Sequence, residues 1–217
     1  MKWIDIYHEK QTSAPDAVKC IKSGDTVYIH PGCCTPEYIV DAMVARKDEL
    51  ENVTVTHILT EGKAAYTQPG MEPHFRHRSL FTGRNVRKAV NDGRADQSHM
   101  FLGEVEKLWL TDLLPIDVAI IQVSPPDEHG FCSFGVGVDI TMSAAHKAKI
   151  VIAMVNQYMP RVHGDCFIHV NKLTHVVEHS TPLLEMPQGT PDETSMKIGK
   201  LIADNVDDGS TLQMGIG

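Results

Sequence analysis

The sequence predicts an α/β fold with an open, mostly parallel sheet and helices on both faces. Apolar strand segments alternate along the chain with amphipathic helical segments, and this order builds a parallel sheet. Several strand segments are apolar almost throughout, as expected where helices bury both faces of such a sheet. A third observation is an internal repeat, because residues 208–217 repeat the pattern of residues 23–32.

The first predicted elements alternate between helix and strand. A short helix runs from Ser13, which can cap it, to about Ile21. A strand over Thr26–His30 comes directly after it. The next helix starts near Pro36, and a β-branched strand follows over Val53–Leu59.

The alternation continues through the rest of the chain. Asn85 is expected to cap a helix that runs through Val90, with Gly93 just beyond its end. The other expected elements are helices over Val105–Leu114, Ile140–Lys147 and Met196–Val206 and strands over Val118–Val123 and Lys149–Asn156.

The internal repeat predicts a second domain that is similar to the first. In each copy a Gly stands two places before a Thr, apolar residues then alternate, and a Gly closes the strand. Residues 181–192 hold three prolines and a glycine, a composition typical of a linker. We therefore expect a first domain over residues 1–186, followed over residues 187–217 by a linker and the start of an incomplete second domain.

Composition argues against several classes of protein. The 217 residues include 20 basic and 28 acidic ones, so the net charge of −8 makes nucleic acid an unexpected partner. No apolar run reaches the roughly 18 residues that span a bilayer, and the N-terminus lacks the features of a signal peptide. Five cysteines without a pairing pattern indicate reduced thiols. We expect a cytoplasmic protein that does not bind membranes.

A small cationic cluster is the exception to this scattered charge. It is interpreted as a solvated surface, with a phosphorylated small molecule as the alternative ligand. Its members are Arg76, Arg78, Arg84, Arg87, Lys88 and Arg94.

Loops that follow strands are the places where chemistry is expected. Residues 124–139 are rich in proline and glycine and follow a strand, and open parallel sheets bind ligands beyond the carboxyl ends of their strands. Ordinary loop structure explains the same composition. His129 beside Asp127 or Glu128 offers acid and base groups, although neighbours in a turn rarely face one site. Asn156 is expected either to shape a cleft or to belong to a rigid crossover loop.

The loop after the first strand holds His30, Cys33 and Cys34. Their spacing does not match a zinc module, and vicinal thiols bind one tetrahedral ion poorly, so no metal is expected. A nucleophilic cysteine is a better alternative, because a loop that precedes a helix N-terminus lowers a thiol pKa. Small residues that line a pocket are the simpler interpretation.

Four segments occur in a fixed order: Arg87–Asp96, Ser124–Gly130 with the following Ser133, Gly135 and Asp139, Met159–Asp165, and Gly215–Gly217. In this order they resemble the acetyl-CoA hydrolase and transferase family, whose members include acetate, butyrate and 4-hydroxybutyrate CoA-transferases. The resemblance covers essentially the whole chain. It implies that the chain holds the first of two similar CoA-transferase domains.

The resemblance also implies an activity, which is the transfer of CoA between a short-chain acyl-CoA and a carboxylic acid through a glutamyl-CoA thioester. Coenzyme A is then a substrate, and a homodimer and a complementary C-terminal domain are the expected partners. Hydrolysis of acyl-CoA is a related alternative, and a non-catalytic CoA-binding or assembly subunit is an alternative from another class.

The resemblance assigns two groups of binding residues and no catalytic one. The family's nucleophilic glutamate lies in the second domain, beyond the end of this sequence, and no glutamate here matches its motif. The residues that match the start of the CoA-contacting loop are Gln213, Gly215, Ile216 and Gly217. The residues that match the loop lining the acyl pocket are Pro31, Gly32 and Cys33.

Overall fold

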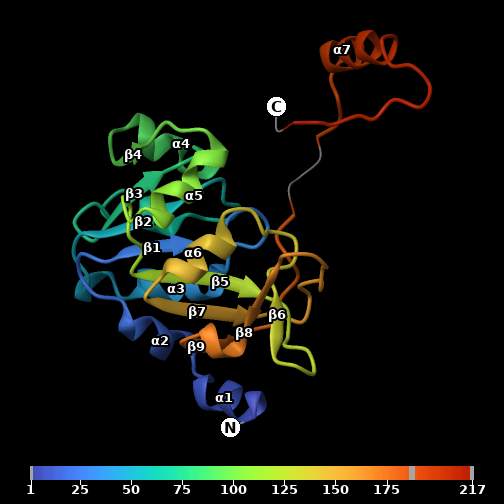
Figure 1. Cartoon of the computed structure of the whole chain (residues 1–217). Helices are drawn as coiled ribbons and strands as arrows, with labels where there is room; N and C mark the ends of the chain where they lie inside the picture. The colour runs from blue at the N-terminus through green and yellow to red at the C-terminus, as the bar shows by residue number, and fades with distance from the viewer. Residues whose placement is uncertain (1, 186–188, 216–217) are drawn as a thin grey trace. The chain divides into compact units, whose positions relative to one another are not determined.

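Seven strands form one parallel sheet in the order β4-β3-β2-β1-β5-β7-β9 (Figure 1). The computed structural model that shows this describes residues 2–185 and 189–215. The strands are β1 (Thr26–Ile29), β2 (Val53–His57), β3 (Phe75–Ser79), β4 (Ala95–Gln97), β5 (Val118–Val123), β7 (Ile150–Val155) and β9 (His175–Glu178). The short strands β6 (Phe131–Ser133) and β8 (Phe167–His169) form a separate antiparallel pair.

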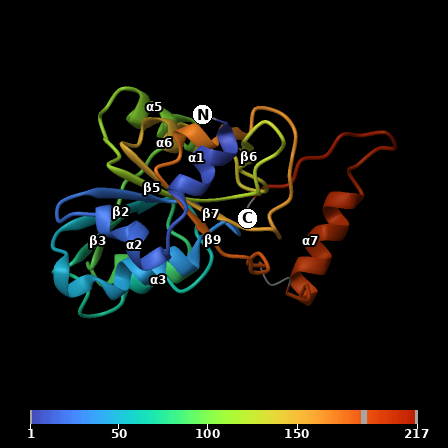
Figure 2. The same cartoon turned by 90° about the horizontal axis from the view of Figure 1, so that it is seen from below.

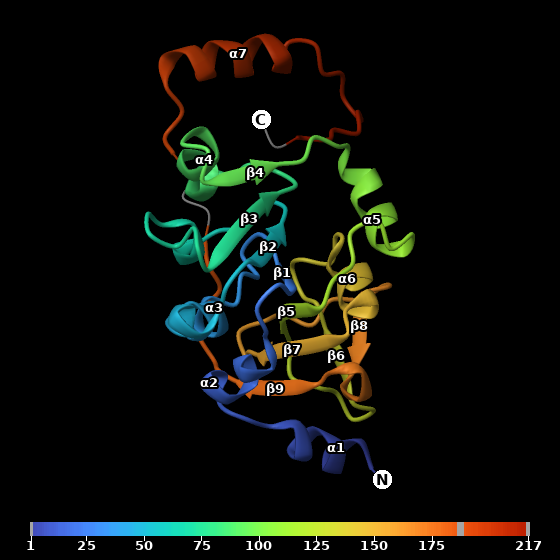
Figure 3. The same cartoon turned by 90° about the vertical axis from the view of Figure 1, so that its left-hand side faces the viewer.

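Helices cover both faces of this sheet, as Figures 2 and 3 show. The helices whose apolar residues pack on one face are α2 (Ala14–Ala17), α3 (Glu37–Ala45) and α4 (Arg84–Asn91). Those on the other face are α1 (Trp3–Lys10), α5 (Leu102–Leu110) and α6 (Thr141–Lys147). Short 3₁₀ helices join these elements at Val18–Cys20, Lys47–Glu49, Ala65–Thr67 and Val170–Lys172. The predicted α/β fold is confirmed.

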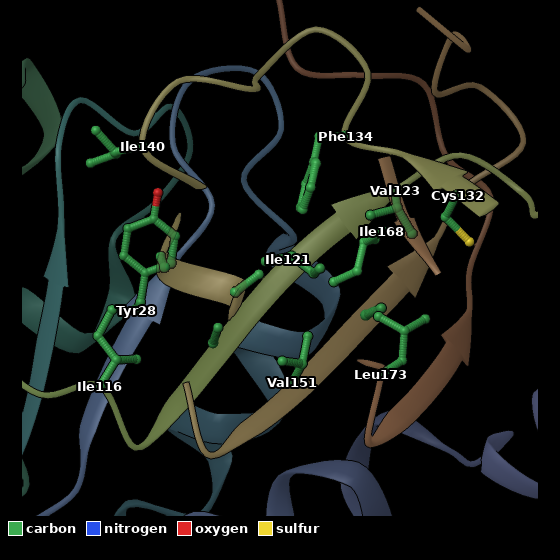
Figure 4. Packing of buried hydrophobic residues seen from close by; sticks show 14 of the residues in the cluster. Tyr28, Ile116, Ile121, Val123, Cys132, Phe134, Ile140, Val151, Ile168 and Leu173 are labelled. Atoms are coloured by element: carbon green, nitrogen blue, oxygen red, sulfur yellow. The ribbon is translucent and has the colours of Figure 1, made fainter. Parts of the chain in front are cut away.

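The alternation of side chains along each strand divides the core into two layers. Val27 and Ile29 of β1 pack beneath α2 and α3, whereas Tyr28 between them packs in the opposite layer with Trp109 of α5. Figure 4 shows this second layer, in which Tyr28 and Ile121 belong to the same cluster as Phe134. Every residue of β5 is buried, which explains why its sequence is apolar except at Gln122.

Most of the predicted elements are present, and one capping prediction is wrong. Helix α4 begins after Gly83, not after Asn85, whose side chain instead donates to Thr60 Oγ1 and to the Gly62 carbonyl oxygen. Gly93 lies beyond the helix end with a φ of +73°, as predicted. Helix α7 (Glu193–Ala203) starts before the expected Met196, because Asp192 caps it.

Several elements were not predicted: α1, β3, β4, β6, β8 and β9. Strand β3 is the clearest case, because its arginines alternate with buried Phe75, His77 and Ser79. The alternation of buried and half-buried residues is a strand signal, but charged and polar residues at most positions hide it.

The chain divides into two compact units, residues 1–185 and 186–217, and the second contains α7. Gly24 and Gly209, at equivalent points of the sequence repeat, both adopt left-handed backbone with φ of +85° and +81°. The strand expected after Gly209 does not form over residues 211–215. A strand needs a neighbour for its backbone donors and acceptors, and no described strand pairs with this segment.

No helix in the ranges 2–185 and 189–215 has the length and apolar character needed to cross a bilayer.

Two buried histidines stack between neighbouring strands. The rings of His57 and His77 lie 4.3 Å apart, and their planes differ by 23°. His77 Nδ1 donates to the Val55 carbonyl oxygen at 2.9 Å, and Tyr66 Oη lies 2.6 Å from His57 Nε2. Burial lowers the pKa of His77 to about 4, and burial together with His77 lowers the pKa of His57 well below its usual value.

We expect the free energy of unfolding to fall as the pH is lowered from 7 to 5. In the unfolded chain these histidines bind protons near pH 6.5, whereas in the folded chain they do so only when the pH approaches the lowered pKa. Between these pH values, proton binding stabilises the unfolded state relative to the folded state. Each histidine contributes a slope of up to about 1.4 kcal/mol per pH unit. Urea unfolding of the chain followed by circular dichroism at several pH values measures this slope.

The variant His77→Leu should reduce this slope, because it removes one of the groups that titrate differently in the two states. The matched control is His99→Gln, at an exposed histidine, which should leave the slope unchanged. An unaltered slope in His77→Leu would show that His77 does not bind protons differently in the folded and unfolded states.

Candidate functional site

Strands β5 and β7 and the segments that follow β1 and β9 surround a cavity of about 240 Å³ at the carboxyl edge of the sheet. Strand order reverses between β1 and β5, and such a switch point is where open α/β sheets bind ligands. The lining residues are Cys33 and Thr35 after β1, Glu37, Tyr38 and Asp41 of α3, Gln122 of β5, Met154 of β7, and His179 and Thr181–Leu184 after β9.

The loop after β1 turns sharply at Gly32, which has a φ of +60°. Its N–H donates to the Leu59 carbonyl oxygen at 2.7 Å, and its carbonyl oxygen accepts from Thr35 Oγ1 at 2.9 Å. The first bond joins the loop after β1 to the loop after β2, and the second lies within the loop after β1. Of the three residues predicted to line an acyl pocket, Cys33 lines the cavity, while buried Pro31 and partly exposed Gly32 form the turn before it.

A buried histidine fastens the glycine-rich loop of residues 134–139 to the sheet. His30 Nδ1 accepts the backbone N–H of Gln122 at 3.1 Å, so the ring proton is on Nε2, which donates to the Gly137 carbonyl oxygen at 2.6 Å. Burial lowers the pKa of His30, and the ring stays neutral. A β-carbon at Gly137 would lie 2.8 Å from both His30 Nε2 and Cys34 Sγ.

Two buried amide side chains connect the loops across three strands. Gln122 Nε2 donates to the Cys34 carbonyl oxygen at 2.9 Å, and Asn156 Nδ2 donates to Gln122 Oε1 and to the Thr181 carbonyl oxygen, both at 2.7 Å. Asn156 Oδ1 accepts the backbone N–H groups of Tyr158 and Thr181. Asn156 is 0% and Gln122 2% exposed, so each lost bond would leave a buried polar group unpaired.

The alternative of a nucleophilic cysteine is wrong for Cys34. Its side chain is fully buried, and burial raises the pKa of the thiol to about 12. The proximity of a helix N-terminus was expected to lower this pKa, but desolvation of the thiolate is the larger effect. Within the described ranges, no three His, Cys, Asp or Glu side chains are grouped so that they could hold a metal ion.

The acid and base groups near His129 do not converge on a site. Asp127 accepts the backbone N–H groups of His129 and Phe131 and forms a 2.5 Å ion pair with Arg161. The His129 side chain is 73% exposed and points to Glu128 at 3.6 Å. The carboxylate of Asp127 therefore stabilises its own turn.

Three of the six residues of the basic cluster form ion pairs within the described residues. Arg76 pairs with Asp96, and Lys88 and Arg94 both pair with Asp92. These pairs agree with the interpretation of a solvated surface rather than an anion site.

The residues expected to contact CoA lie in the unit of residues 186–217. Gln213 and Gly215 are exposed there, and Ile216 and Gly217 lie outside the described residues.

Sequence reasoning missed Gln122 and Glu37 as parts of the site. Gln122 did carry a signal, because it is a polar residue inside an otherwise apolar strand and needs a buried partner. Asn156 was expected either to shape a cleft or to belong to a rigid loop, and its four hydrogen bonds connect two loops of the cavity.

A family model described as the N-terminal domain of acetyl-CoA hydrolase/transferase matches residues 2–185. The chain is 45% identical over 217 residues to the 4-hydroxybutyrate coenzyme A transferase of Clostridium kluyveri, covering 100% of this chain and 51% of that protein. It is 42% identical over 200 residues to the succinyl-CoA:acetate/propanoyl-CoA:succinate CoA transferase of Fasciola hepatica, covering 91% and 41%. The chain thus spans about half the length of the curated relatives it matches.

Solved structures show the same similarity. RipA from Yersinia pestis superposes with a TM-score of 0.90 at 29% identity, over 100% of this chain and 53% of that one. The 4-hydroxybutyrate CoA-transferase from Porphyromonas gingivalis superposes with a TM-score of 0.82 at 35% identity, over 100% and 50%.

We expect Gly137→Ala to destabilise the chain by about 1–3 kcal/mol, because the added methyl group would press on His30 and Cys34. Gly103→Ala is the matched control. No atom lies within 4 Å of the position its β-carbon would take, and alanine favours the helix there by up to about 1 kcal/mol. Urea unfolding measures the free energy of unfolding of both variants. Equal values would show that the loop of residues 134–139 can move to accommodate the added methyl group.

Asn156→Ala should cost about 2–4 kcal/mol of unfolding free energy, because it leaves buried groups of Gln122 and Thr181 without partners. The comparison is Asn91→Ala at an exposed position of α4, where we expect a change of less than about 0.5 kcal/mol. Similar losses in both variants would contradict a special role for the amides that connect the loops.

Proposed function

Because the chain belongs to the acetyl-CoA hydrolase/transferase family through its N-terminal domain, we propose that it forms half of a CoA-transferase. The enzyme would move CoA between a short-chain acyl-CoA and a carboxylic acid such as acetate or 4-hydroxybutyrate. The observation that carries this proposal is the match over residues 2–185 together with a similarity that spans the whole chain and includes proteins named CoA-transferases.

The cavity at the switch point is the proposed place of the acyl group. Its volume of about 240 Å³ lies below the roughly 300–1,000 Å³ of pockets for drug-sized ligands and suits a short acyl chain. In the proposal, Pro31 and Gly32 shape the loop, and Cys33 contacts the acyl group. Gln213, Gly215, Ile216 and Gly217 are proposed to begin the loop that contacts CoA.

The proposed reaction takes its nucleophile from the complementary C-terminal domain. A glutamate carboxylate there attacks the thioester carbonyl, giving a mixed anhydride and a CoA thiolate. The thiolate attacks the glutamyl carbonyl, which releases the first carboxylic acid and leaves a glutamyl-CoA thioester, and the acceptor acid then reverses these steps. The present chain would position the acyl group and limit the access of water, in a homodimeric cytoplasmic enzyme.

The relatives from Clostridium kluyveri and Fasciola hepatica are named for different acyl groups. One is named for 4-hydroxybutyrate and the other for succinyl-CoA. Family membership therefore supports the reaction class, and the preference between a neutral and an anionic acyl group has to come from the residues of the cavity.

We expect the natively purified protein, together with any polypeptide that copurifies, to convert butyryl-CoA and acetate into acetyl-CoA. Intact mass measurement identifies the polypeptides present. Borohydride reduction during turnover, followed by peptide mass spectrometry, should locate a modified glutamate outside this chain. Mixing this chain with the C-terminal half of the Clostridium kluyveri relative is a complementation assay, with each half alone as control.

The transfer assay also distinguishes a CoA-transferase from a hydrolase and from a non-catalytic subunit. Release of free butyrate at the same rate with and without acetate would indicate a hydrolase. A melting shift with CoA, in a sample that gives no transfer even after complementation, would indicate a binding or assembly subunit and contradict the proposal.

A further inference from the structure

Glu37, in the first turn of α3, places a carboxylate in the wall of the cavity. Both carboxylate oxygens accept the backbone N–H of Lys63 at 3.3 Å. The side chain also packs closely on Gly62, where an added β-carbon would lie 2.4 Å from Glu37 Oε1. These contacts with the loop after β2 hold the half-buried carboxylate at a defined place in the wall.

The charge of Glu37 is compensated only in part, by Lys63. Asp41, one turn further along α3, forms a 2.8 Å ion pair with Lys63 Nζ, so this ammonium group is shared with a second acid. Among the described residues that line the cavity, none is lysine or arginine. Burial, with a smaller effect of Asp41, raises the pKa of Glu37, which shows the cost of a negative charge at this point.

Two other polar groups of the wall already make hydrogen bonds within the protein. Thr35 Oγ1 donates to the Gly32 carbonyl oxygen, and the amide of Gln122 is bonded to Cys34 and Asn156. The ring of His179 is stacked on Tyr38 with centroids 4.0 Å apart. Among the described residues, Glu37 accepts hydrogen bonds only from the backbone N–H of Lys63, at 3.3 Å, so the carboxylate oxygens can accept a further hydrogen bond from a ligand.

We propose that Glu37 selects the acyl group by charge, so that the cavity takes neutral short acyl groups, including hydroxylated ones, and rejects those that carry a second carboxylate. The inference rests on the proposed function, in which this cavity holds the acyl group. A second carboxylate would lie beside Glu37 in a partly desolvated wall, where no lysine or arginine is among the described lining residues, and like charges repel strongly there. A hydroxyl group in the same place donates to Glu37.

The test compares succinyl-CoA with butyryl-CoA in the complete enzyme, with acetate as acceptor. Glu37→Gln keeps the size of the side chain and removes its charge, and we expect it to raise the ratio of kcat/KM for succinyl-CoA to that for butyryl-CoA by about tenfold or more. Asp48→Asn removes one negative charge at an exposed position, and its ratio should stay within twofold of the unmodified enzyme.

A second variant tests the same idea in the opposite direction and leaves Glu37 in place. Lys63→Met removes the ammonium group that Asp41 shares, at a side chain that is 67% exposed, so the fold should tolerate it. The ratio of kcat/KM for succinyl-CoA to that for butyryl-CoA should then fall by about threefold or more, because the wall becomes more negative.

Glu37→Asp keeps the negative charge that Glu37→Gln removes. It should therefore discriminate against succinyl-CoA as the unmodified enzyme does.

The results distinguish this inference from the proposed function. Absence of butyryl-CoA transfer in the unmodified enzyme would overturn the proposed function. Transfer that is present, with ratios unchanged in both Glu37→Gln and Lys63→Met, would overturn charge selection by Glu37 and leave the transferase in place.

Discussion

The need to bury both faces of a parallel sheet governs the rest of this structure. Helices cover the two faces and leave the carboxyl edge as the place where strand ends and polar side chains meet. Polar groups that are buried at this edge need hydrogen-bond partners, because an unpaired buried amide destabilises the fold by more than a hydrogen-bonded one stabilises it. Gln122 and Asn156 are therefore bonded on nearly every side, and their bonds hold together loops that are far apart in sequence.

The close packing of these loops gives the cavity a defined wall. The 2.8 Å approach expected of a β-carbon at Gly137 shows how little space separates the glycine-rich loop from His30 and Cys34. A rigid wall suits the proposed division of labour, in which this chain positions an acyl group and another domain supplies the reactive carboxylate. The cysteines take no chemical part in that proposal, and the raised pKa of Cys34 agrees with a thiol that serves as a small buried side chain.

Electrostatics distinguishes the cavity from the rest of the chain surface. Most charges elsewhere are exposed and many are paired, as Arg76, Lys88 and Arg94 of the basic cluster are, and such pairs contribute little. Glu37 differs because its carboxylate is half-buried and faces a cavity rather than bulk water. A partly buried charge in such a wall has a larger effect on the choice of ligand than several charges on the surface.

Local patterns were enough to predict the fold class, the strands β1, β2, β5 and β7, and the family, because apolar runs and spaced motifs can be recognised without knowing any tertiary contact. It did not reveal β3 or β4, whose polar residues depend on neighbouring strands for their structure, and it placed a strand over residues 211–215 where no described partner exists. Only the tertiary structure decided which residues share the cavity. Glu37, Gln122 and His179 lie in three distant parts of the sequence, and strand order and register alone bring them together.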